Sequence, residues 1–237
     1  MTLLEMLNAV LMESSHLSRS AFAASSNIDD RQMVALANRA AREIRDFYDW
    51  SALTDVFSID PTDGPDASTK DANGRYPLPE DYRSLVPDSA WETDGSRKID
   101  LPVPRGRWFM YKFSTLTDAG RLRARIYDKA IEVHEPSAPG PFQFEYVSKY
   151  VVYDSSGQGR EQFTKDDETF RLDDNLLILG TQAWWAKSKM MPQAPEWMAD
   201  YQDKLIQAVG IDAGGQVIGG SPTVDRRAPY YPLYRRV

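Results

Sequence analysis

The hydrophobic periodicity of this chain changes twice along its length, and that change constrains the fold more than any other feature. Apolar residues recur at helical spacing near both ends and alternate with polar residues in between. Close to the N-terminus, Thr2 and Glu5 have the spacing of a capping box, in which a hydroxyl and a carboxylate bond free amides at a helix start. This pattern predicts a helix over residues 3–13.

Three further helices are predicted by apolar stripes and by the residues that bound them. An aspartate caps a helix well because its carboxylate accepts from free amides, and proline suits the first turn because it has no amide hydrogen to leave unpaired. The expected helices are 30–48 after Asp29 or Asp30, from Asp173 or Asp174 to about Lys189, and from Pro195 to Gly210.

Between Trp50 and Leu172 the pattern is that of β structure. Prolines and glycines recur every few residues, and they separate short runs in which aromatic or β-branched residues alternate with other residues. Strands of an antiparallel sheet are expected at Phe109–Phe113, Arg121–Tyr127, Ala130–Val133, Phe142–Tyr146 and Tyr150–Val152, with a tight hairpin turn over Tyr127–Ala130.

Helices with one apolar face must bury that face against another element, and the simplest burial packs the four helices together. The sequence therefore predicts an α+β fold: a four-helix bundle with a β-rich antiparallel insertion and an extended C-terminal arm. The expected boundaries are 1–49 and 173–210 for the two parts of the bundle, 50–172 for the insertion and 211–237 for the arm.

The final stretch, Gly214–Val237, cannot build a core of its own. It contains two glycine pairs and three prolines, which favour bends and interrupt helices and strands. It is nevertheless rich in the residue types that dominate protein contacts. These are Arg226, Arg227, Tyr230, Tyr231, Tyr234, Arg235 and Arg236. The composition predicts an arm that binds a partner, and the alternative is a disordered terminus or one that packs on its own domain.

Charge limits the classes of partner. A net charge of −7 argues against a protein that coats nucleic acid, because such a protein would be basic. Residues 211–237 hold four arginines and two aspartates, so the rest of the chain has a formal charge of −9 and the arm is basic. The chain has no cysteine, no apolar run of membrane-spanning length and no basic stretch typical of a signal peptide at its N-terminus.

Candidate catalytic groups are few. Two histidines, His16 and His134, do not supply a triad or a metal cluster unless they meet in space. The densest carboxylates, at 166–168 and 173–174, are adjacent residues that point in different directions, and the second pair suits a helix start. We therefore expect no catalytic, metal-binding or cofactor-binding residue, and a protein that is not an enzyme.

A subunit interface is the sharpest expectation outside the arm. Arg121, Arg123 and Arg125 alternate and share one face of a predicted strand. Such a row faces either phosphates or the acids of a neighbouring chain, and the acidic composition favours the second. Trp184 and Trp185 lie about 100° apart on a helical wheel, so both cannot face one core. We expect Trp185 and the three arginines to contribute to contacts between subunits.

Seven short segments, in a fixed order, carry a resemblance that no single motif provides. They are Thr2–Asn8, Leu36–Ile44, Tyr48–Leu53, Tyr76–Tyr82, Leu85–Trp91, Phe144–Lys149 and Leu172–Gly180. Over most of residues 1–210 they resemble the head-to-tail adaptor proteins of tailed bacteriophages, especially short-tailed ones, which are also called tail tubular protein A or head completion proteins.

The resemblance implies a role in the virion. It implies a ring of twelve copies at the head–tail interface, assembled in the host cytoplasm, which joins the portal protein to the tail nozzle protein. The helices would form the ring wall and the arm would bind the portal. Double-stranded DNA would pass through without specific binding, and no cofactor or membrane is implied. The alternatives are a tail-associated hydrolase and a sequence-tolerant DNA-binding protein that uses the arginines of 105–125.

Overall fold

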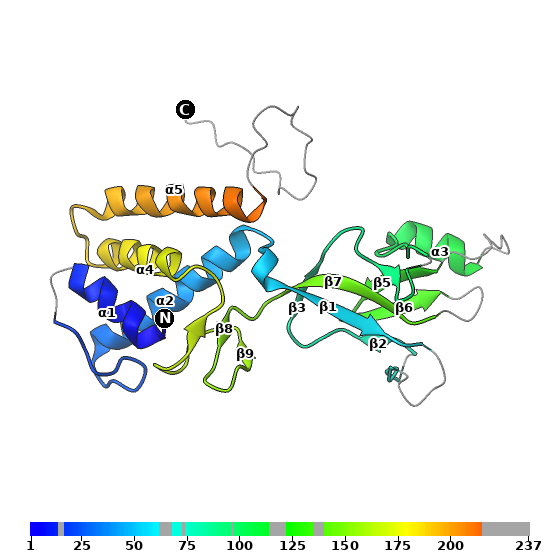
Figure 1. The fold of residues 1–237 in the computed structure, drawn as a ribbon, viewed down its shortest axis with the longest axis horizontal. Helices are drawn as coiled ribbons and strands as arrows, with labels where there is room; N and C mark the ends of the chain where they lie inside the picture. The colour runs from blue at the N-terminus through cyan, green and yellow to red at the C-terminus, as the bar shows by residue number, and fades with distance from the viewer. Residues whose placement is uncertain are drawn as a thin grey trace, which may run out of the picture. The chain divides into compact units, whose positions relative to one another are not determined.

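A computed structural model gives the structure of the protein, which forms two compact units (Figure 1). Unit 1 comprises Met1–Leu53 together with the chain from Lys149 onward, and unit 2 comprises Thr54–Ser148. Unit 2 is therefore an insertion in the sequence of unit 1. The structure describes residues 1–13, 17–61, 68–72, 74–95, 97–113, 122–134 and 140–214.

Unit 1 is built mainly from helices. They are α1 (Leu3–Glu13), α2 (Ile28–Phe47), α4 (Asp174–Ser188) and α5 (Ala194–Asp212), with a short 3-10 turn, η1 (Ser51–Leu53), after α2. The predicted capping box of α1 is confirmed. The amide of Thr2 donates to Glu5 Oε2 at 2.9 Å, and the amide of Glu5 donates to Thr2 Oγ1 at 3.3 Å.

The ends of the other helices differ from the expected ones by a few residues. α2 starts earlier because Asn27 is its cap, and the Asn27 side chain accepts from the amide of Asp29 at 2.9 Å. The predicted cap of α4 is confirmed, since the Asp173 side chain accepts from the amide of Asn175 at 2.8 Å. α5 continues past Gly210, because an exposed glycine weakens a helix without ending it.

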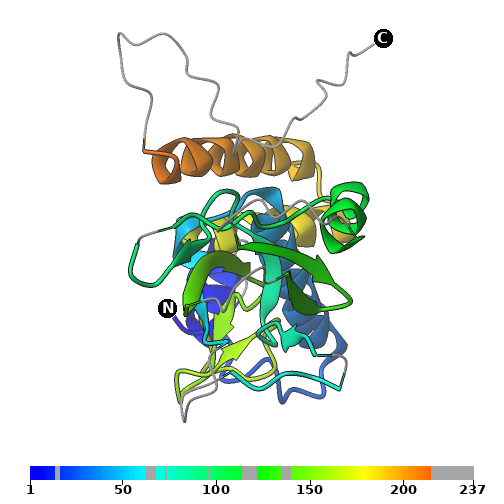
Figure 2. The same ribbon diagram turned by 90° about the vertical axis from the view of Figure 1, so that its right-hand side faces the viewer.

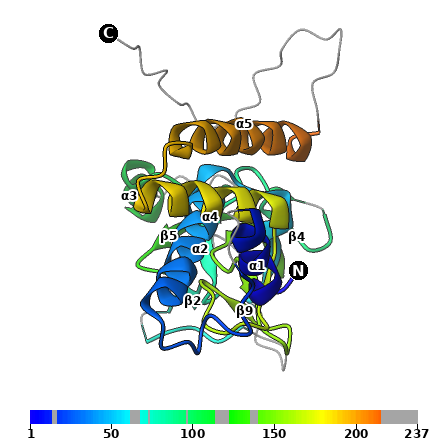
Figure 3. The same ribbon diagram turned by 90° about the vertical axis from the view of Figure 1, so that its left-hand side faces the viewer.

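α4 is the central helix of unit 1 and packs against α1, α2 and α5. Figure 3 shows α4 between α5 on one side and α1 and α2 on the other. Side chains are buried all around α4, for example Leu177 and Trp185, because neighbours surround it. In contrast, α5 buries only Tyr201 and Leu205 among its described side chains. Most of the surface of α5 is therefore free of contacts within unit 1.

The expected four-helix bundle is wrong. The described part of the chain forms a mixed α+β fold with five helices and three antiparallel sheets, and one helix, α3 (Arg105–Phe113), belongs to unit 2. In unit 1 a small sheet accompanies the helices, and α5 packs chiefly on α4. Hydrophobic periodicity indicates which face of a helix is apolar, but it does not say which element covers that face.

The small sheet of unit 1 has the strand order β10-β8-β9. Its strands are β8 (Val152–Tyr153), β9 (Gly159–Arg160) and β10 (Thr169–Phe170). The loop before β10 holds the start of α1, since the amides of Leu3 and Leu4 donate to the carbonyl oxygens of Glu168 at 2.8 Å and Asp166 at 3.1 Å. The expected insertion of residues 50–172 therefore divides, and residues 149–172 belong to unit 1.

The larger sheet of unit 2 is organised around β7 (Phe142–Ser148), which pairs with three antiparallel strands. These are β1 (Thr54–Ile59), β3 (Tyr82–Leu85) and β4 (Trp91–Glu92). The ladder of β1 and β7 runs from Thr54 opposite Val147 to Ile59 opposite Phe142. The first and last strands of unit 2 are thus direct neighbours. Figure 2 shows the twist of the strands of this unit.

The second sheet of unit 2 has the order β2-β6-β5, with β2 (Tyr76–Pro77), β6 (Ala130–His134) and β5 (Arg123–Tyr127). The predicted hairpin turn is confirmed, because Asp128 and Lys129 connect β5 to β6 with φ angles of 51° and 59°. Two consecutive positive φ angles are typical of the tight turns that match strand twist. The two sheets share an apolar core that includes Ile59, Tyr76, Ile99, Ala124, Ile131, Phe142 and Phe144.

The strand expected at Phe109–Phe113 is wrong, since these residues lie in α3. The alternation of aromatic residues there is coincidental, and the side chain that faces the core is Trp108, which is 1% exposed. Met110 is 69% exposed on the other side of the helix. Pro104 directly precedes α3, a position that suits proline at a helix start.

Candidate interaction surfaces

The seven arm residues predicted to bind a partner lie outside the described residues. The structure does describe the place where the arm begins. α5 ends at Asp212, whose carboxylate accepts from the Ser51 amide at 3.0 Å and from the Ser51 hydroxyl at 2.6 Å. These bonds fasten the end of α5 to the start of η1, so the arm leaves unit 1 from a fixed point.

The arginine row expected at a subunit interface is used within unit 2. Arg121 lies outside the described residues. Arg123 is only 4% exposed, and its guanidinium lies 3.8 Å from the centre of the Tyr111 ring. Arg125 Nε donates to Glu132 Oε2 at 2.8 Å across the β5–β6 ladder. Neither side chain is a free cation for a neighbouring chain or for phosphates.

The adjacent tryptophans face different surroundings, as the helical wheel requires, but Trp185, which was expected at a subunit contact, is the buried one. Trp185 is 4% exposed and therefore offers almost no area to another subunit. Trp184 is only partly buried, and its side chain contacts α2. Its Nε1 donates to Glu43 Oε2 at 2.8 Å, and the Arg39 guanidinium lies 3.5 Å above its ring. Periodicity could not separate the two because α4 is covered on nearly all sides.

The dense carboxylates of unit 1 hold loops in place. Asp166 accepts from the amides of Phe22 and Ala23, at 3.1 Å and 2.9 Å. Glu168 is fully buried and accepts from the Thr164 hydroxyl at 2.8 Å and from a backbone amide of the same loop. These bonds give both carboxylates a structural role.

A further carboxylate shapes the turn between β8 and β9. Hydrogen bonds from the Ser156 hydroxyl and then from the Gln158 amide hold the pKa of Asp154 well below its usual range. Arg160 also donates to this carboxylate, with Nη2 at 3.0 Å from Asp154 Oδ2. Each donor belongs to the turn itself, so the lowered pKa reflects local structure.

The structure describes one of the two histidines considered for acid–base chemistry. His16 lies outside the described residues, and the ring of His134 makes an edge contact with Trp108, with centroids 6.1 Å apart. Among the described residues, no three His, Asp or Glu side chains are grouped so that they could hold a metal ion.

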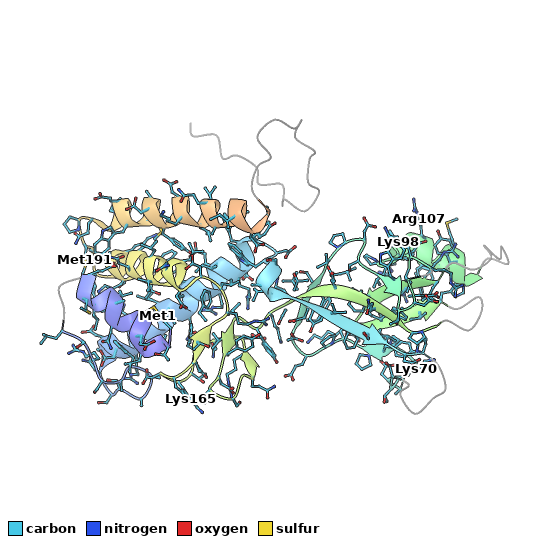
Figure 4. All side chains as sticks on the ribbon, in the orientation of Figure 1. Met1, Lys70, Lys98, Arg107, Lys165 and Met191 are labelled. Atoms are coloured by element: carbon cyan, nitrogen blue, oxygen red, sulfur yellow. The ribbon has the colours of Figure 1, made fainter. Side chains whose placement is uncertain are left out.

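Unit 2 has a pocket of about 560 Å³ that sequence reasoning missed. Its charged lining is Asp88, Lys98, Asp100 and Arg107, and prolines supply much of the rest. Lys98 Nζ lies 2.8 Å from Asp88 Oδ1. Figure 4 labels Lys98 and Arg107, which lie near each other in this unit. Because cations and carboxylates are equal in number, the pocket favours neither an anionic nor a cationic ligand.

Aromatic and apolar side chains are also exposed on unit 2. Met110 and Phe109 of α3 and Tyr127 of β5 are 69%, 44% and 53% exposed. The Arg125 guanidinium lies 5.0 Å from the centre of the Tyr127 ring and 5.8 Å from that of Phe109. Mixed arginine and aromatic surfaces are common where proteins bind one another. The sequence did not indicate this patch because α3 was assigned as a strand.

None of the helices in the described part of the chain has both the length and the apolar content needed to cross a bilayer. Comparison of the sequence with protein-family models, and separately with curated proteins, found no match.

Proposed function

We propose that this protein is a structural adaptor of a bacteriophage virion. In this proposal, copies of unit 1 form a ring between the portal protein and the tail nozzle protein, DNA passes through the ring, and the C-terminal arm binds the portal. The observation that carries the proposal is the arm itself, a basic segment rich in tyrosine and arginine that follows a fastened helix end on an acidic body.

Several features of the body favour assembly over catalysis. The dense carboxylates Asp166, Glu168 and Asp173 accept from backbone amides and stabilise loops or a helix start. A catalytic acid or base would instead face a cleft where a substrate could bind. Much of the surface of α5 is exposed in unit 1, and a ring subunit needs such a face for its neighbour.

The arm has the reach that the proposal requires. An extended chain spans about 3.1–3.3 Å per residue, so Gly214–Val237 could extend roughly 75 Å. Ordering such a segment costs about 1–2 kcal/mol per residue. The tyrosine and arginine contacts must exceed this cost, and the repetition of the arm around a ring adds avidity.

Truncation of the arm tests the proposal. We expect that deletion of residues 221–237 abolishes co-purification with the portal protein of the same phage, because it removes the tyrosines and arginines. The circular dichroism spectrum and the thermal midpoint should stay those of the full chain. A control with residues 221–237 in scrambled order keeps the charge and length, and we expect it also to lose binding. Unchanged portal binding by the truncated protein would refute the proposal.

A further inference from the structure

We infer that the outer face of α5 in one copy binds the outer face of α2 in the next copy, so that the helices of unit 1 carry two complementary halves of one subunit contact. This inference rests on the proposed function, since it names the surfaces through which a ring would close.

The outer face of α5 is acidic. Glu196, Asp200 and Asp203 follow one another at intervals of four and three residues, so they share one face, roughly opposite the buried Tyr201 and Leu205. All three are exposed. Within the described part of the chain, none of the three carboxylates forms an ion pair. Together they extend over about 10 Å of the helix.

The outer face of α2 is basic. Arg31, Arg39 and Arg42 are exposed on the side away from the buried Met33, Ala37 and Ile44. Arg31 and Arg42 have no carboxylate partner among the described residues. The Nε of Arg42 donates to the carbonyl oxygen of Asn38 at 3.2 Å, which leaves its other guanidinium nitrogens available.

Neighbouring charges on α2 are already satisfied. The Arg39 guanidinium lies 3.5 Å from the centre of the Trp184 ring, so it already makes a contact within unit 1. Arg45 pairs with Asp46 at 2.7 Å. Arg31 and Arg42 are therefore the cations that a partner would meet, and the rise of a helix separates their backbones by about 16 Å.

The two faces cannot satisfy each other within one copy. Both helices pack against α4, as the closeness of Gly180 to Tyr201 of α5 and to Ala40 of α2 shows. Figure 3 shows α4 between them. The charged faces are on the sides turned away from these buried contacts. A second copy can present the missing partner for each face.

Such a contact joins different surfaces of identical chains. A contact of this heterologous kind leaves one α5 face and one α2 face free at the ends of a row, and the row closes into a ring or continues as a filament. Exposed ion pairs are individually weak, but complementary rows of charge steer the approach and fix the register. Between bodies that carry a formal charge of −9, repulsion disfavours other approaches.

Charge reversal tests the inference with full-length protein. Variant A carries Glu196→Lys, Asp200→Lys and Asp203→Lys, and variant B carries Arg31→Glu and Arg42→Glu. Each variant alone would face like charges at the contact, so we expect sedimentation velocity to show loss of the assemblies that the wild type forms. An equal mixture of A and B should recover them, because alternating copies restore opposite charges at every contact. Combining all five changes in one chain should also recover assembly.

A matched control reverses charges elsewhere on unit 1. Glu13→Lys with Asp167→Lys changes two exposed carboxylates outside both faces, and we expect it to assemble as the wild type does. Circular dichroism confirms that each variant is folded. A wild type that stays monomeric, variants A and B that assemble unchanged, or a mixture that does not recover would overturn the inference. In the last case the acidic face binds something else, such as the basic arm.

The proposed function and this inference fail separately. Variants A and B keep the arm, so they should still bind the portal protein as single copies. Deletion of residues 221–237 should remove portal binding while the wild-type charge contact persists. Loss of assembly only in A and B therefore concerns the helix faces, and loss of portal binding only in the truncated chain concerns the arm.

Discussion

Gly180 of α4 lies where this helix packs against both α5 and α2. A Cβ atom at this position would lie 2.9 Å from the Tyr201 ring of α5 and 3.1 Å from the Ala40 Cβ of α2. Alanine is favoured over glycine in a helix by about 1 kcal/mol, but overpacking of a core costs about 1–3 kcal/mol. Because Tyr201 is fully buried and cannot move aside, we expect Gly180→Ala to lower the free energy of unfolding, measured by urea denaturation.

Gly210 provides the control for that prediction. It lies in α5, and a Cβ atom there would have no neighbour within 4 Å. Gly210→Ala should therefore raise the free energy of unfolding by about 0.5–1 kcal/mol, through helix propensity alone. If Gly180→Ala stabilised the protein to the same extent, the packing described at this crossing would be incorrect.

At the scale of elements, α1 depends on a loop that is distant in sequence. The Glu168 carboxylate accepts from the Thr164 hydroxyl and the Lys165 amide, and the Glu168 carbonyl accepts from the Leu3 amide. Glu168→Ala removes the buried acceptor of these part-buried hydrogen bonds, and hydrogen bonds to a charged group contribute about 1.5–3 kcal/mol. We expect a loss of stability in that range and faster hydrogen exchange at Leu3 and Leu4, measured by NMR.

Asp167 is the matched control for Glu168. Its side chain is exposed beside the same loop, and surface substitutions usually change stability by no more than about 0.5 kcal/mol. Asp167→Ala should therefore leave both the stability and the exchange rates close to those of the wild type. Equal effects of the two substitutions would mean that the buried carboxylate does not hold the loop.

Most helices and the β5–β6 hairpin could be predicted from the sequence because their signals are local. The Thr2–Glu5 capping box and the turn at Asp128 and Lys129 are decided by residues a few positions apart. α3 could not be predicted, since alternating aromatic residues match a strand and only the buried Trp108 shows that the helical period applies. The helices that surround α4 could not be predicted either, because α1 and α2 are distant from it along the chain.

The candidate surfaces were predicted less well than the elements. Burial of Arg123 and Trp185 depends on which strand or helix lies opposite, and their sequence neighbourhood gives no sign of it. The charged faces of α2 and α5 could have been found, since their charges follow helical spacing. The sequence does not show that both helices pack on α4 and leave those faces uncovered.

At the scale of the whole molecule, unit 2 should be removable. Thr54 lies opposite Val147 in the β1–β7 ladder, and paired strands are about 5 Å apart, so Leu53 and Lys149 can be joined by a few glycines. We expect the chain without residues 54–148 to fold with a cooperative thermal transition, measured by circular dichroism. It should also keep the proposed contact between α5 of one copy and α2 of the next, since both helices belong to unit 1.

A second deletion decides where the insertion ends. The sequence pattern placed the end of the insertion at residue 172. Removal of residues 54–172 also removes β8, β9, β10 and the Glu168 loop that holds α1. We expect this longer deletion to prevent cooperative folding of unit 1. Equal folding of the two shortened chains would contradict the assignment of residues 149–172 to unit 1.

The pairing of Thr54 with Val147 also decides how the chain responds to tension. A force that draws Leu53 away from Lys149 acts on the end of the ladder at Thr54 and Val147. The hydrogen bonds of the ladder then break one after another toward Ile59 and Phe142. A ladder loaded along its strands would have to break many bonds at once. In the intact protein unit 1 holds both ends of this ladder together, because the Arg171 guanidinium donates to the carbonyl oxygens of Ala52 at 3.2 Å and of Tyr150 at 3.0 Å. Unit 2 therefore lengthens under load only after unit 1 has opened at these bonds.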